Sequence, residues 1–118
     1  MTDWRAVLYG VVVTALAEAV GLTLPGIGHL AAGLVGGFVA GYVADGGIVR
    51  GGWHGLLAGS IVGLVVGLIA AVVVGATGAL LGPVGPLLGG GLFLAVAVFT
   101  LLGAIPSALA GAVGAVLS

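Results

Sequence analysis

The chain has no cysteine, and its 118 residues include only two basic and three acidic side chains. Without cysteine there is no disulfide framework, no thiolate nucleophile and no cysteine-based metal site. Two basic residues form no cationic patch, which excludes nucleic acid and polyanionic substrates as partners. Charged residues make up 4% of the sequence, against about 25% in soluble domains. So few charges could not cover the surface of a water-soluble fold.

The sequence is rich in apolar residues. They make up 62% of the sequence, and the mean hydropathy is +1.49. Four apolar segments approach or exceed the ~20 residues that cross a bilayer core of ~30 Å. These segments cover about residues 6–24, 27–44, 52–81 and 88–117. We therefore expect a single integral membrane domain over residues 1–118, with an all-α fold that forms a transmembrane four-helix bundle.

The two arginines predict the orientation of the spans. Arg5 precedes the first segment and Arg50 follows the second, so four spans put both on the same side, which the positive-inside rule makes cytoplasmic. An interfacial aromatic belt would occupy the same boundary, where the sequence has Trp4, Tyr9, Tyr42 and Trp53. Asp45 and Arg50 are expected to pair in the loop there, or to cap the adjoining helices. We expect a multi-pass protein of the cell membrane with both termini inside (N-in/C-in).

Small residues recur at every fourth position of the third segment, from Gly51 to Ala79. In a soluble helix each such glycine would cost about 0.8–1.0 kcal/mol relative to alanine. In lipid the helix persists, and a row of small residues lets another helix approach closely. The predicted packing ridge, a glycine zipper, consists of Gly33, Gly37 and Gly41 in the second segment and Gly51, Gly55, Gly59, Gly63, Gly67 and Gly75 in the third.

The ridge turns around its helix by about 40° at each step, so a straight partner helix follows only about three or four steps. We therefore expect one end of the ridge to pack within the chain. The other end is expected to pack against a second copy, giving a homo-oligomer, or against another membrane protein. The alternative is that two neighbouring helices of one bundle absorb the whole ridge.

Glu18 is the one ionisable residue deep inside an apolar segment. It lies about 10 Å inside the end of the first helix, and a carboxyl at that depth marks a candidate functional site by default. His29 begins the next segment and is expected to approach Glu18 across the turn. Thr14 adds a hydroxyl one turn away on the same face. The three residues form a candidate intramembrane polar site, which is either a hydrogen-bonded or protonated carboxyl or a short path for protons or ions.

The remaining polar residues do not predict catalysis. His54 is expected beside water at the cytoplasmic boundary, on the face opposite His29, so the two cannot share a metal. Ser60 and Ser107 are isolated hydroxyls with no histidine or carboxylate at their depth. We expect no enzyme activity, no catalytic residue, no metal site and no cofactor.

Pro106 interrupts the fourth segment. A proline inside a helix removes one hydrogen bond and frees the carbonyl group four residues earlier, here that of Leu102. Thr100 and Ser107 are expected to help satisfy this region.

Two glycine-rich stretches carry a resemblance to a known family. Residues 36–47 read GGFVAGYVADGG and residues 50–59 read RGGWHGLLAG. Together they resemble the GG-x-x-AGY and G-x-x-AG pattern of small haloarchaeal integral membrane proteins, a domain family of unknown function. The resemblance covers the second and third segments and extends loosely to all four. It implies a multi-span membrane protein of archaeal type and implies no active site, and Glu18 lies outside the matching stretches.

The sequence therefore favours a structural or interaction bundle, in contact with the lipid bilayer, that self-associates or binds a membrane partner through its small-residue ridges. The alternative is a small channel or transporter subunit that uses Glu18. A water-accessible cavity reaching Glu18 would favour that alternative.

Overall fold

The computed structural model describes residues 1–118, which form four α-helices and no strand. The helices are α1 (Trp4–Gly21), α2 (Ile27–Ala44), α3 (Ile48–Gly78) and α4 (Val84–Leu117), and one 3₁₀ turn, η1 (Ala79–Leu81), follows α3. All four helices are long and apolar enough to cross a membrane. The predicted all-α fold with four membrane-length helices is confirmed.

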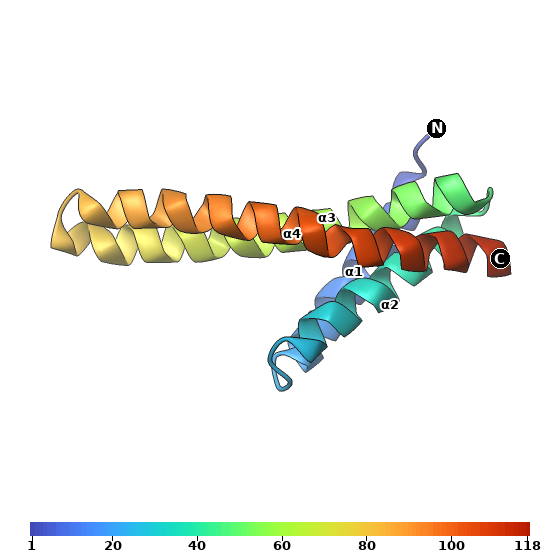
Figure 1. Ribbon diagram of the computed structural model, residues 1–118, viewed down its shortest axis with the longest axis horizontal. Coiled ribbons are helices and arrows are strands. Elements are labelled where there is room, and N and C mark those ends of the chain that lie inside the picture. Colours follow the sequence, from blue (N-terminus) through green and yellow to red (C-terminus); the bar gives the residue numbers. More distant parts are fainter. The chain divides into compact units, whose positions relative to one another are not determined.

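The chain divides into two compact units, and the helices of each can be followed by colour in Figure 1. The first unit contains residues 1–62 and 103–118, which comprise α1, α2, the beginning of α3 and the end of α4. The second unit contains residues 63–102, which comprise the rest of α3, η1 and the beginning of α4.

Local hydrogen bonds set the ends of α1, which differ from the predicted bounds. The helix begins at Trp4 because the Asp3 carboxylate caps it, accepting hydrogen bonds from two backbone N–H groups at 3.0 and 3.4 Å. It ends at Gly21, and beyond that end Thr23 Oγ1 donates to the Val20 carbonyl oxygen at 2.8 Å. These bonds satisfy backbone groups that a helix leaves open at its termini.

The turn between α2 and α3 is shorter than predicted. Only residues 45–47 lie outside the helices, and their φ angles of 37°, 152° and 93° are all positive. Glycine at 46 and 47 adopts such angles without steric cost, so the chain reverses quickly and α3 begins at Ile48 rather than at residue 52. Arg50 therefore lies in the first turn of α3 and not in a loop.

Two prolines lie within α4. The helix begins at Val84, four residues earlier than predicted, and it tolerates Pro86 in its first turn because the missing N–H is not needed there. The helix continues through Pro106. Ser107 does not serve the carbonyl that Pro106 frees; its Oγ donates instead to the Gly55 carbonyl oxygen of α3 at 2.8 Å. The expectation for Ser107 was therefore wrong.

Glycines bring α1 and α2 into contact in the first unit. A methyl group added at Gly28 would overlap the backbone of Gly21. One added at Gly10 would lie 2.6 Å from Ala40 Cβ, far inside van der Waals contact. Close approach of this kind is possible only where a side chain is absent, and it increases the dispersion attraction between the helices.

The end of α4 meets α2 and α3 in the same way. A Cβ at Gly41 would overlap the carbonyl oxygen of Gly111, and a Cβ at Gly37 would overlap the backbone of Ser107. On α3, a Cβ at Gly55 would also overlap the Ser107 carbonyl oxygen. Backbone atoms of α4 thus occupy the space beside glycines of both helices in the first unit.

In the second unit, α3 and α4 run side by side as a hairpin (Figure 1). Gly63 faces Thr100 and Gly67 faces Val96, whose side chains fill the space that a Cβ would need. Near the turn, a Cβ at Gly78 would come within 2.7 Å of Gly85 Cα.

The α3 part of the predicted ridge is therefore covered by α4 at each of its glycines, in both units. The positions concerned are Gly51, Gly55, Gly59, Gly63, Gly67 and Gly75. The argument that one helix follows only a few steps assumed a straight partner, and it was wrong here because α4 lies beside every one of these glycines. On α2, Gly37 and Gly41 are covered as well, whereas Gly33 has nothing within 4 Å of a Cβ position.

This contrast on α2 gives a test of the packing. Gly41→Ala is expected to lower the free energy of unfolding by about 1–3 kcal/mol, because the new methyl overlaps the Gly111 carbonyl. Gly33→Ala adds the same methyl where no atom of the chain lies within 4 Å, so in the monomeric protein it is expected to raise stability by up to about 1 kcal/mol through its better helix propensity. Denaturation in detergent micelles, followed by circular dichroism, measures both. Equal effects of the two substitutions would contradict the close contact of α2 with α4.

Candidate functional site

Glu18 and His29 lie together across the α1–α2 turn. Nδ1 of His29 is 2.6 Å from Oε1 of Glu18, and the two side chains are 48% and 18% exposed, respectively. The contact is an ion pair when the imidazole is protonated. The structure thus brings together two of the three residues of the candidate polar site.

Thr14, the third residue, does not join this pair. Its Oγ1 donates to the Gly10 carbonyl oxygen of its own helix at 2.8 Å. The side chain is buried against Gly36 of α2, where it fills the space that a Cβ would need. The hydroxyl is therefore used in helix packing, and the expected three-residue polar path reduces to the Glu18–His29 pair.

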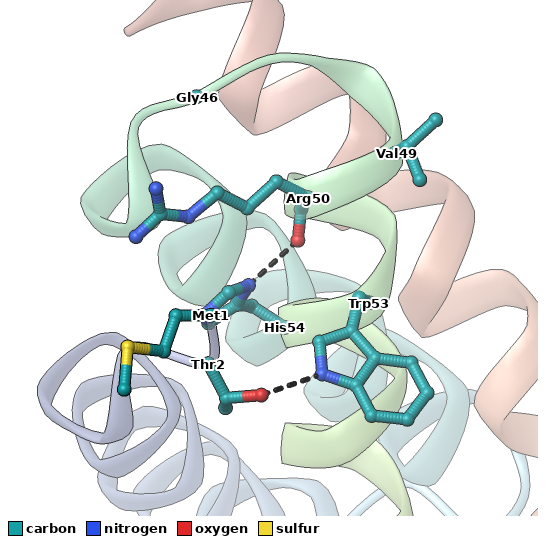
Figure 2. A pocket seen from close by; sticks show the side chains of 7 residues that line it. All are labelled: Met1, Thr2, Gly46, Val49, Arg50, Trp53 and His54. Carbon is teal, nitrogen blue, oxygen red and sulfur yellow. Dashed lines mark hydrogen bonds between the residues drawn. The ribbon is translucent and has the colours of Figure 1, made fainter.

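A second polar cluster surrounds His54, near the start of α1 (Figure 2). The sequence placed His54 beside water, but the side chain is completely buried. Its Nε2 lies 2.8 Å from the backbone nitrogen of Asp3, and its Nδ1 lies 2.6 Å from the Arg50 carbonyl oxygen. The imidazole therefore links the segment before α1 to the first turn of α3.

These two contacts assign the tautomer of His54. A backbone N–H can only donate, so Nε2 must accept the hydrogen bond from Asp3 and carries no proton. A carbonyl oxygen can only accept, so Nδ1 carries the proton and donates it to Arg50. The network thus holds His54 as a neutral imidazole with both nitrogens engaged.

Further hydrogen bonds join the ends of the chain to this cluster. Trp53 Nε1 donates to Thr2 Oγ1 at 3.0 Å. Ser118 Oγ lies 2.8 Å from the Ala115 carbonyl oxygen and 3.3 Å from Asp45 Oδ1, and its single proton is shared between these two acceptors. Both ends of the described chain and the α2–α3 turn therefore lie at the same end of the first unit. No ion pair joins Asp45 to Arg50, so the pairing expected from the sequence does not form.

No group of three or more His, Cys, Asp or Glu side chains is placed to hold a metal ion.

Four membrane-length helices, joined by glycine contacts and two small polar clusters, define the class of multi-pass helical membrane proteins. Residues 4–117 match DUF5518, a protein family of unknown function, and the chain belongs to this family. Neither a curated protein nor a solved structure matches the chain.

The pair across the α1–α2 turn can be tested with a double-mutant cycle of Glu18→Gln and His29→Ala. His29→Ala is expected to destabilise more than Glu18→Gln, because it leaves a half-buried carboxylate without its partner. The coupling free energy should be about 0.5–3 kcal/mol. Unfolding in detergent micelles measures all four proteins. Additive effects of the two substitutions would show that the contact does not stabilise the hairpin.

Proposed function

We propose that this protein is a structural or interaction protein of the cell membrane. In this proposal it is a glycine-packed helical scaffold without catalytic activity, and it self-associates or binds a membrane partner. The family and the four membrane-length helices support the general class. The resemblance of residues 36–59 to haloarchaeal proteins leads us to propose an archaeal origin as well.

The use of the buried polar side chains supports a scaffold. Ser107 bonds the backbone of α3, Thr14 bonds the backbone of its own helix, and His54 bonds two backbone groups. Each of these potential reactive groups is engaged with a backbone atom within the chain. The Ser107 bond joins α4 to α3 and the bond of His54 to Asp3 holds the segment before α1, in a medium where an unsatisfied polar group is costly.

The proposed orientation puts both termini in the cytoplasm. The hydrogen bonds that join residues 2, 3, 45, 53, 54 and 118 gather the chain ends and the α2–α3 turn at one end of the first unit. Arg5 and Arg50, the only basic side chains apart from histidine, belong to the first turns of α1 and α3 at this end. The positive-inside rule assigns such an end to the cytoplasm.

The observation that carries the proposal is a set of uncovered glycines on α2 and α4. Nothing lies within 4 Å of a Cβ position at Gly33, Gly90, Gly91 and Gly103. A glycine within a helix costs about 1 kcal/mol relative to alanine, and a residue that faces only lipid gains nothing in return. A second helix packed against it would offset that cost through close backbone contact. We therefore assign association to these glycines and not to the ridge that α4 covers.

The second candidate function is a channel or transporter subunit that uses Glu18. Its support is the close pair with His29. Against it, Thr14 does not extend the pair into a path. An open cavity of the first unit is lined by Arg50 and His54 among others, and Glu18 is not one of its lining residues. The scaffold is therefore the better supported function.

The molecular mass of the protein in nanodiscs or mild detergent tests the proposal. The wild type is expected to have a mass of at least twice the 11.1 kDa of one chain. At least one of Gly33→Leu, Gly91→Leu and Gly103→Leu should shift it toward the monomer, because the new side chain blocks close approach. Each variant should keep the helix content of the wild type, because no atom of the chain lies within 4 Å of the added Cβ.

Leu101→Ile, at an exposed position on α4, serves as the matched control and should leave the mass unchanged. A wild type that is strictly monomeric at every protein-to-lipid ratio would refute self-association. An oligomer unaffected by all three glycine variants would refute the surface assigned to it.

A further inference from the structure

A cavity opens in the first unit where the segment before α1, the α2–α3 turn and the first turns of α3 meet (Figure 2). Its volume is about 380 Å³, within the range of about 300–1,000 Å³ typical of small-molecule sites. The residues that line it are Met1, Thr2, Gly46, Val49, Arg50, Trp53 and His54. None of them belongs to the glycine surfaces described above or to the Glu18–His29 pair.

Arg50 is the one charged side chain that lines this cavity. Figure 2 shows it extending from α3 beneath the turn at Gly46, and a Cβ at Gly46 would lie 2.6 Å from Arg50 Cδ. The guanidinium has no hydrogen-bond or ion-pair partner within the chain. Neither Asp3 nor Asp45 forms an ion pair with it. A guanidinium stays charged in proteins and is stabilised by an anion.

The other polar groups of the cavity restrict the ligand to a hydrogen-bond acceptor. Both nitrogens of His54 are occupied by backbone groups. The Thr2 hydroxyl accepts from Trp53 Nε1, which leaves its own proton free to donate. Thr2 and Arg50 therefore both present donors, and the planar guanidinium fits two oxygens of a phosphate group at once.

The rim of the cavity is apolar and lies at the end of a helix that can cross a membrane. Val49 is 88% exposed and Trp53 is 50% exposed. Tryptophan and arginine at a helix end are typical of the interface between lipid headgroups and acyl chains. We propose that this cavity binds the phosphate of an anionic phospholipid, with Arg50 and Thr2 on the phosphate oxygens and Trp53 and Val49 against the apolar part of the lipid.

Tryptophan fluorescence provides the measurement. The chain has two tryptophans, so Trp4→Phe leaves Trp53 as the sole reporter. In detergent, titration with short-chain phosphatidylglycerol should give a saturable change in emission, and phosphatidylcholine should bind about tenfold more weakly because its choline cation is repelled by Arg50.

Arg50→Gln in the same background should weaken phosphatidylglycerol binding about tenfold. Arg5→Gln removes the other arginine, which does not line the cavity, and is the matched control; its effect should stay within about twofold. Arg50→Lys keeps the charge but loses the forked geometry, so it should bind between Arg50→Gln and the wild type. Circular dichroism of each variant verifies that the helices are retained.

Equal affinity for the two lipids, or equal losses in Arg50→Gln and Arg5→Gln, would overturn the proposal. Inorganic phosphate is titrated in parallel. A saturable response to inorganic phosphate that Arg50→Gln abolishes would assign the cavity to a free anion and would overturn the assignment to a lipid. The self-association described above is measured by mass and is independent of this result.

Discussion

Direct contact between helix backbones is the interaction on which this structure depends. In lipid, apolar side chains gain nothing by leaving their surroundings for one another, so helices adhere through close packing and a few hydrogen bonds. The chain meets this constraint by removing side chains on both sides of a contact, as at Gly21 with Gly28 and at Gly41 with Gly111. Glycine, which weakens a helix in water, here allows the contacts that hold the helices in place.

Two polar side chains, Ser107 and His54, have a complementary role, because each fixes one position along the otherwise apolar surfaces of the helices. Ser107 determines which part of α3 lies beside α4, and His54 determines where the segment before α1 is held. Apolar helices with smooth glycine faces could slide past each other with little change in energy, whereas a hydrogen bond is satisfied at one position only. Ser60 is different, since its buried Oγ has no partner in the chain.

The structural features that the sequence predicted correctly are those that depend on composition or on residues close together in the chain. Hydropathy predicted the four helices, and the tight turn after α1 predicted that Glu18 and His29 would approach each other. Helix ends depended on single hydrogen bonds, such as the Asp3 cap, which hydropathy does not detect. The contact of His54 with Asp3 joins residues 51 positions apart and depends on tertiary packing. The ridge on α3 was read from the sequence, but the sequence did not show that α4 would cover all of its glycines, because that contact depends on tertiary packing.

The helices come in two lengths, and the difference affects the surrounding lipid. α1 and α2, with 18 residues each, are about 27 Å long and match a hydrocarbon core of ~30 Å. α3 and α4, with 31 and 34 residues, reach about 46 and 51 Å. To fit within the core, the longer pair would have to tilt by more than about 50°, beyond the range of about 0–40° seen for membrane helices. The longer pair therefore has more apolar length than the core of an ordinary bilayer covers. A thicker bilayer would cover more of this apolar length, so the protein is expected to collect in thicker patches of membrane.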